Sequence, residues 1–140
     1  MDAEATALFL SLRPRFAEML LDGRKSVELR RVRPNAQSGS VVLLYATSPD
    51  RTLVGRAEIA EIEVASLQDI WDRHGWATGL NRTEYDAYFD GVDQAVAIGL
   101  RRICRLAQPR PLDDLRRRLV GFRPPQSFRY LDSLQVASLI

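Results

Sequence analysis

The fold of this chain is decided near its start, by the stretch LSLRPRFAEMLLDGRKSVELR at residues 10–30. The apolar run that leads into this stretch predicts a short strand over Ala7–Leu12. Pro14 suits the first turn of a helix, where its missing N–H costs nothing. Gly23 is placed to end that helix with a left-handed cap. The stretch therefore predicts a strand, a helix and a tight turn in succession.

A second strand is expected directly after this turn. Its apolar residues, Val27 and Leu29, alternate with polar ones. The polar residues, Glu28 and Arg30, therefore point to one side of the strand. Because Lys25 emerges from the turn beside them, an ammonium, a carboxylate and a guanidinium are expected in one small region. Such a trio suits a polar, anionic ligand, although a salt-bridge cluster that pins the helix to the strand would use the same residues.

The remaining elements follow from apolar periodicity and from capping residues. Strands are expected over residues 26–33, 41–47, 53–64 and 95–106. Helices are expected from Ser66 to near Gly75, from Asn81 to Gly91 and from Pro111 to before Pro124. A final turn or helix is expected over residues 126–140. Within residues 53–64 the apolar positions change from odd to even. A bulge near Ala60 and Glu61 would keep both sets in the core.

This order of elements favours one fold class. Strands and helices do not alternate regularly along the chain, so a doubly wound parallel sheet is disfavoured. We expect a single domain over residues 1–140 with an α+β fold. Its centre is expected to be a small mixed, mostly antiparallel β-barrel of about five or six strands, with short flanking helices.

Composition excludes several classes of protein. With 46% hydrophobic and 27% charged residues the chain is expected to be globular rather than disordered. No apolar run approaches the roughly 20 residues of a membrane span, and no signal-peptide pattern is present, so a cytoplasmic location without a membrane partner is expected. One cysteine and one histidine cannot furnish an ordinary zinc site. Neither a metal nor a cofactor is therefore expected.

The net charge is only +2, but it is unevenly distributed. Residues 10–33 hold seven cations and three anions, residues 101–130 hold nine cations and two anions, and residues 66–100 hold two cations and six anions. If the two basic segments meet in space, they form a positive face suited to phosphates. Alternatively, arginines such as those at 116–118 only solubilise an exposed surface. Lys25 is the sole lysine among twenty cations, which suggests that a compact amine is needed there.

Residues 10–30 resemble the start of an ASCH domain, a family of the PUA-like superfamily. That family is recognised by Gly-x-Lys-x-x-Glu-x-Arg, which is present here as Gly23, Lys25, Glu28 and Arg30. Further agreement lies in LYATSP at 44–49, VGRA at 54–57, the helix end at 88–91 and PPQSFRYL at 124–131. The resemblance covers nearly the whole chain. It implies a small β-barrel with flanking helices and a cleft that holds RNA or a nucleotide.

Ten residues are candidates for contact with RNA or another nucleotide-like ligand. They are Arg13, Arg15, Lys25, Glu28, Arg30, Tyr45, Thr47, Ser48, Ser127 and Tyr130. Cationic side chains can hold phosphate oxygens, and aromatic faces or hydroxyl groups can hold an unstacked base. Tyr45 is equally interpretable as a core residue. Packing accounts for Ser127 and Tyr130 as well as ligand contact does.

Three functions remain open from the sequence. The first is a non-catalytic binder of RNA. The second is a metal-independent hydrolase acting on an acylated nucleoside or on RNA, with Lys25 as general base and Glu28 beside it. The resemblance includes a branch that hydrolyses acetylcytidine, in which threonine stands at the position of Glu28; a glutamate does not supply that hydroxyl. In addition, a neighbouring carboxylate favours the charged form of an amine, which opposes the use of Lys25 as a base. The third is a regulatory module that binds a metabolite or a protein.

Overall fold

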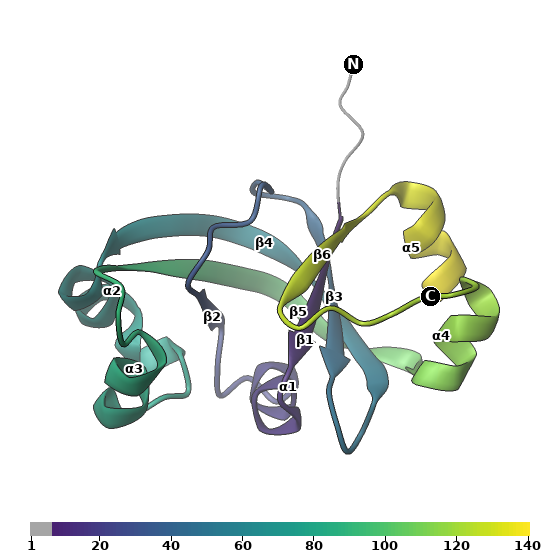
Figure 1. The fold of residues 1–140 in the computed structure, drawn as a ribbon, viewed down its shortest axis with the longest axis horizontal. Helices are drawn as coiled ribbons and strands as arrows, with labels where there is room; N and C mark the ends of the chain where they lie inside the picture. The colour runs from purple at the N-terminus through teal and green to yellow at the C-terminus, as the bar shows by residue number, and fades with distance from the viewer. Residues whose placement is uncertain (1–6) are drawn as a thin grey trace.

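Residues 7–140 are described by the computed structural model, and their strands form one sheet (Figure 1). The strands are β1 (Ala7–Leu12), β2 (Val27–Arg30), β3 (Val41–Ala46), β4 (Thr52–Ser66), β5 (Gln94–Pro111) and β6 (Phe128–Leu131). They lie in the order β2-β5-β4-β3-β1-β6. The pairing of β1 with β3 is parallel, and the other four pairings are antiparallel. The predicted mixed, mostly antiparallel α+β fold is confirmed.

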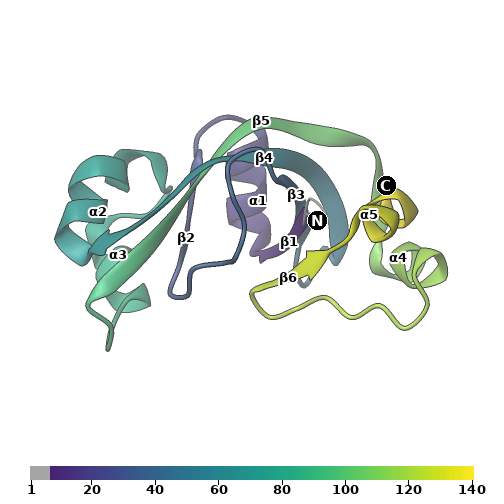
Figure 2. The ribbon, with the colours of Figure 1, turned by 90° about the horizontal axis from the view of Figure 1, so that it is seen from above.

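The sheet curls because its two longest strands, β4 and β5, bend (Figure 2). Their pairing shifts register at three points, one of them between Ile59 and Glu61. An extra residue on one strand bends that strand and increases its twist. The bulge predicted near Ala60 and Glu61 is therefore confirmed. The expected barrel is a curled half-barrel, since β2 and β6 remain as the two edges of the sheet.

Five α-helices and one short 3₁₀ segment are described around the sheet. They are α1 (Pro14–Leu21), α2 (Leu67–His74), η1 (Gly75–Ala77), α3 (Arg82–Tyr88), α4 (Leu112–Arg118) and α5 (Ser133–Leu139). The predicted caps are present, since the Ser66 hydroxyl accepts from the Asp69 amide and Asn81 forms a capping box with Glu84. Strand β6 was not predicted. It forms because residues 128–131 pair with the exposed edge of β1.

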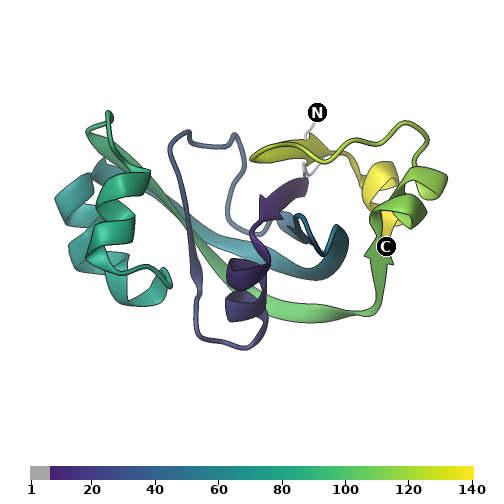
Figure 3. The same cartoon turned by 60° about the horizontal axis from the view of Figure 1, so that its bottom comes forward.

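Alternation along β1 and β3 sends side chains to two separate cores. Leu10 and Leu44 pack with Ala17 and Leu20 of α1. Phe9 and its neighbours on that face pack with residues of α4 and α5. A third cluster lies beneath α2 and α3, which cover the far end of β4 and β5 (Figure 3). None of the described helices is long and apolar enough to cross a membrane.

Candidate functional site

A cavity of about 660 Å³ lies where the half-barrel fails to close, between the edge strand β2 and the end of β1. Its lining comes from five parts of the chain: β1 with α1, β2 with the turn before it, the residue after β3, α3 with the residues before it, and the residues before β6. The lining residues are Ser11, Leu12, Arg13, Arg15, Phe16, Lys25, Glu28, Leu29, Arg30, Thr47, Leu80, Glu84, Ala87, Tyr88, Gln126 and Ser127. The Arg30 Nη2 atom donates to the Ser11 carbonyl at 3.0 Å and so spans the gap.

Lys25, Glu28 and Arg30 meet at the floor of this cavity. The Lys25 Nζ atom lies 3.1 Å from Oε1 of Glu28, and Nη1 of Arg30 lies 2.5 Å from Oε2. The side chains of Lys25 and Glu28 are 3% and 6% exposed, and that of Arg30 is 12% exposed. The turn closed by Gly23, which has a φ of 85°, delivers Lys25 to the start of β2. Two cations thus share one carboxylate, which leaves the floor positive.

The Lys25 ammonium has an acceptor for each of its three N–H donors. It donates to the Val27 carbonyl at 2.8 Å and to the Thr78 carbonyl at 2.6 Å, and Glu28 is its third partner. The Phe16 ring lies beneath it, with 5.1 Å between Nζ and the ring centroid. A general base needs a free lone pair. This geometry argues against Lys25 as a base and makes it a buried structural cation.

The environment of Glu28 favours its ionised form. Burial raises the pKa of its carboxyl, but the opposing charges of Arg30 and then Lys25 outweigh burial, so the pKa lies below its usual value. The pair partner Arg30 still holds hydrogen-bonding capacity. Within residues 7–140 its buried Nε atom has no hydrogen-bond partner. The carboxylate is therefore an anchor that aligns a guanidinium beside the cavity.

The rim of the cavity carries exposed cations. Arg13 and Arg15 are both exposed, and the guanidinium of Arg15 lies 4.8 Å from the centroid of the Phe16 ring. Arg15 also donates to Glu84 of α3 at 2.9 Å. The Arg15 hydrogen bond lowers the pKa of the Glu84 carboxyl. Thr47 and Ser127 add hydroxyl groups beside the end of β1, where the Thr47 amide donates to the Leu12 carbonyl and the Ser11 amide donates to the Ser127 carbonyl. Seven of the ten candidate residues thus line one cavity.

The other three candidates lie elsewhere. Tyr45 is 2% exposed and packs against Phe9 with ring centroids 5.4 Å apart, because strand alternation turns it toward the core beneath α4 and α5. Ser48 is exposed in the turn between β3 and β4 and is outside the cavity lining. The Tyr130 hydroxyl accepts from the Asn35 amide at 2.7 Å and so ties the loop after β2 to β6. The structure thus places these three side chains outside the lining of the cavity, and the packing role left open for Tyr45 and Tyr130 accounts for those two.

Sequence reasoning missed Tyr88 and Gln126. Tyr88 lines the cavity, its hydroxyl donates to the Leu29 carbonyl at 3.2 Å, and its ring packs edge-on against Phe89. A signal was available for it, because Tyr85 and Phe89 form the buried i, i+4 stripe of this helix and leave Tyr88 beside the stripe. Gln126 precedes a strand that was not predicted, so no local pattern placed it.

Within residues 7–140, no three His, Cys, Asp or Glu side chains gather closely enough to hold a metal ion. The groups that the cavity offers a ligand are guanidinium, hydroxyl, amide and aromatic groups, and its two carboxylates, Glu28 and Glu84, are paired with cations. Guanidinium groups pair with phosphates, and the others recognise bases or sugar hydroxyls. The arrangement is thus suited to hold an anionic, hydrogen-bonding ligand.

Comparison with known proteins gives consistent matches. A family model described as ASCH domain matches residues 10–103. A Zymomonas mobilis protein named ASCH domain-containing ribonuclease is 32% identical over 131 residues, which are 94% of this chain and 88% of that protein. The crystal structure of ASCH from Zymomonas mobilis matches with a TM-score of 0.90 and 32% identity, and the match covers 95% of this chain and 92% of the chain in that structure. A mutant of the ASCH protein from Zymomonas mobilis has a TM-score of 0.91 with 30% identity, over 99% and 96% of the two chains.

Proposed function

This chain belongs to the ASCH domain family, and we propose that its cavity binds a single-stranded segment of RNA. The observation that carries this proposal is the charge of the cavity lining, in which four cations outnumber two carboxylates. The cations are Arg13, Arg15, Lys25 and Arg30, and the carboxylates are Glu28 and Glu84. A volume of about 660 Å³ is within the range of pockets that hold small molecules. The relative named a ribonuclease supports RNA as the ligand class.

The proposed contacts divide by chemistry. Arg13 and Arg15 hold backbone phosphates, which positions the strand without reading its sequence. The Tyr88 ring, which is partly exposed, provides a face on which one base stacks. Thr47, Ser127 and Gln126 offer donors and acceptors to a base edge or to a ribose 2′-hydroxyl. Lys25 and Glu28 do not touch the ligand in this proposal but hold Arg30 in place.

Salt dependence of binding tests the proposal. The affinity for a labelled 12-nucleotide single-stranded RNA is measured between 50 and 200 mM salt for wild type and for the double variant Arg13→Gln/Arg15→Gln. We expect the variant to bind more weakly. Its salt slope, the change in log affinity with log salt concentration, should be smaller in magnitude by about 1.4, at roughly 0.7 for each lost phosphate contact. The charge-matched control is Arg101→Gln/Arg102→Gln on β5. Binding that ignores salt, or an equal loss in both double variants, would overturn the proposal.

Cleavage of RNA is a second candidate function, and the ribonuclease name of a relative that spans 94% of this chain favours it. RNA carries its own nucleophile, the 2′-hydroxyl, so cleavage needs only proton transfer and stabilisation of charge on the phosphate. In this proposal Arg13 and Arg15 supply the stabilisation. Lys25 is not used as the base in this proposal, because each of its three N–H groups has an acceptor. Water takes the 2′-hydroxyl proton and returns one to the 5′-oxygen that leaves.

Turnover assays separate these possibilities. Purified protein is incubated with end-labelled RNA, with a chelator added to remove stray metal, and separately with acetylcytidine. Cleavage of RNA that Arg13→Gln/Arg15→Gln abolishes would establish a ribonuclease. Binding without turnover of either compound leaves an RNA-binding domain. Binding of free nucleosides or metabolites with no affinity for RNA would instead identify a regulatory module.

A further inference from the structure

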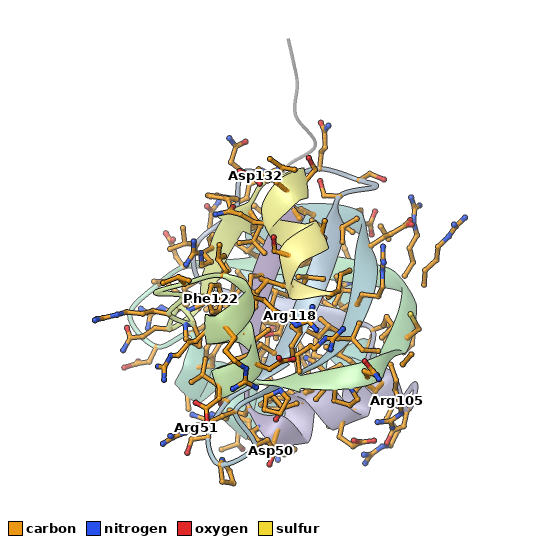
Figure 4. All side chains as sticks on the ribbon, turned by 90° about the vertical axis from the view of Figure 1, so that its right-hand side faces the viewer. Asp50, Arg51, Arg105, Arg118, Phe122 and Asp132 are labelled. Atoms are coloured by element: carbon orange, nitrogen blue, oxygen red, sulfur yellow. The ribbon has the colours of Figure 1, made fainter. Side chains whose placement is uncertain are left out.

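Helix α4 and the turn beside it carry positive charge that neighbouring acids only partly neutralise. Asp114 is shared by three guanidinium groups, those of Arg110 at 3.5 Å, Arg117 at 3.6 Å and Arg118 at 3.2 Å. Arg51 and Arg116 pair with no acidic side chain among residues 7–140. We name Arg51, Arg116, Arg117 and Arg118 the α4 arginine patch; Figure 4 faces this side of the molecule and labels Arg51 and Arg118. All four are exposed.

The members of the α4 arginine patch come together through the fold rather than through sequence. The Leu112 amide donates to the Arg51 carbonyl at 2.9 Å, which joins the start of α4 to the turn after β3. Burial raises the pKa of Tyr45, and the positive charges of Arg51 and Arg116 oppose that rise. Both cations therefore lie near the same phenol, although 65 residues separate them.

The patch adjoins the cavity. The Arg51 amide donates to the Thr47 carbonyl at 3.1 Å, and Thr47 lines the cavity. From the other end of α4 the chain runs through the exposed Arg123 to Gln126, which also lines the cavity. Arg51 is thus the member of the patch that lies next to the rim, and the segment from α4 to Gln126 leads along the chain to the cavity lining.

Charge also indicates the direction that a bound strand takes. The cavity of about 660 Å³ is too small to enclose a 12-nucleotide strand, so an RNA of that length must leave it on one side. The α2–α3 side is built from residues 66–100, which hold six acids and two cations. A polyanion is repelled there and attracted toward α4. The field attracts any polyanion, and RNA is chosen as the occupant because a strand held in the cavity, as proposed above, continues toward the patch.

We propose that single-stranded RNA held in the cavity continues across the turn at Thr47–Arg51 and lays its phosphate backbone on the α4 arginine patch. This inference rests on the proposed function of the cavity. The contacts are to phosphates, so the patch adds affinity without reading bases. RNA longer than the cavity should therefore bind more tightly than RNA that only fills it.

The test varies the length of the RNA and the place on the protein where arginines are removed. Affinities for a 3-nucleotide and a 12-nucleotide single-stranded RNA are measured for wild type, for Arg116→Gln/Arg117→Gln/Arg118→Gln, and for the charge-matched control Arg56→Gln/Arg101→Gln/Arg102→Gln on β4 and β5. Glutamine keeps the helix propensity of arginine, and circular dichroism verifies folding. We expect the α4 variant to bind the 3-mer like wild type and to lower the salt slope for the 12-mer by about 2, at roughly 0.7 per phosphate contact.

The outcomes separate this inference from the proposed function. If both lengths bind but the α4 variant matches the control, the patch has no role and the cavity proposal stands. If neither length binds, both proposals fail. The inference is also overturned if the α4 variant loses as much affinity for the 3-nucleotide RNA as for the 12-nucleotide RNA. It is overturned as well if the α4 variant loses as much affinity for duplex DNA as for the 12-nucleotide RNA, since the patch would then be a general anion surface.

Discussion

The Glu28 carboxylate is clamped between two cations, with Oε1 3.1 Å from Lys25 Nζ and Oε2 2.5 Å from Arg30 Nη1. All three side chains are nearly excluded from solvent. A buried charge of this kind is tolerated only when its partners are in place. The cluster therefore connects the stability of the domain to the shape of its cavity.

Replacing Glu28 with glutamine should destabilise the protein by about 3 kcal/mol, because it leaves two buried cations without a compensating charge. Unfolding in urea, followed by circular dichroism, measures the loss. The control is Glu84→Gln at the rim, where solvent screens the pair with Arg15 and glutamine preserves the capping box of α3. Equal stability of Glu28→Gln and wild type would contradict this account of the floor.

The same pair predicts a pH dependence. The pKa of Glu28 is lower in the folded state than in the unfolded chain, where it is about 4.3. Its contribution to stability is thus present above the unfolded pKa and is lost as pH falls through the folded pKa. The stability difference between wild type and Glu28→Gln should stay constant from pH 7 to about 5 and shrink below about pH 4. A difference that persists unchanged at pH 3 would exclude an ionised Glu28.

Tyr88 is expected to contribute its ring rather than its hydroxyl to binding. Tyr88→Phe loses the hydrogen bond to the Leu29 carbonyl but keeps the aromatic face, so its RNA affinity should stay close to that of wild type. Tyr88→Leu loses the face and should weaken binding by about 1–3 kcal/mol, the range for stacking of one base. Titration of labelled RNA compares the two. Equal affinities of the two variants would remove Tyr88 from the site.

Gly79 closes the floor from the α3 side. Its φ is 76°, and a Cβ there would lie 2.8 Å from Met19 Cε and 3.4 Å from Lys25 Cδ. Gly79→Ala should therefore cost more than the roughly 1 kcal/mol of backbone strain. Gly121→Ala is the matched control, with a φ of 78° and no atom within 4 Å of its added Cβ. Thermal unfolding should place Gly79→Ala below Gly121→Ala, and equal losses in the two variants would show that Met19 yields without cost.

Gly55 allows α1 to pack closely on the sheet. A Cβ at this position would lie 2.7 Å from Leu21 Cδ2 and 2.8 Å from the Cys104 carbonyl oxygen, and a backbone atom cannot rotate away. Gly55→Ala should destabilise the protein by about 2 kcal/mol through overpacking. Gly99→Ala meets only ordinary contacts at 3.5 Å and beyond, so it should be neutral or slightly stabilising. Urea unfolding of the two variants checks the contrast.

Local patterns predicted much of this fold because each depends on neighbours in sequence. Apolar runs and alternation predicted β1 to β5, capping residues predicted the starts of α2 and α3, and the change of parity near Ala60 predicted the bulge. Strand β6 escaped prediction because it forms only by pairing with β1, more than 110 residues away. The turn after α1 predicted that Lys25, Glu28 and Arg30 would converge.

What the sequence determined by itself was the α+β class and the local grouping of three charged side chains around one turn. Only the tertiary structure decided which candidates share a cavity, because that depends on where the two free edges of a curled sheet come to lie. It brought in Tyr88 from α3 and turned Tyr45 into the core. It also gave the ammonium of Lys25 two backbone acceptors, one of them 53 residues away along the chain. Long-range packing sets such contacts, and no local periodicity encodes them.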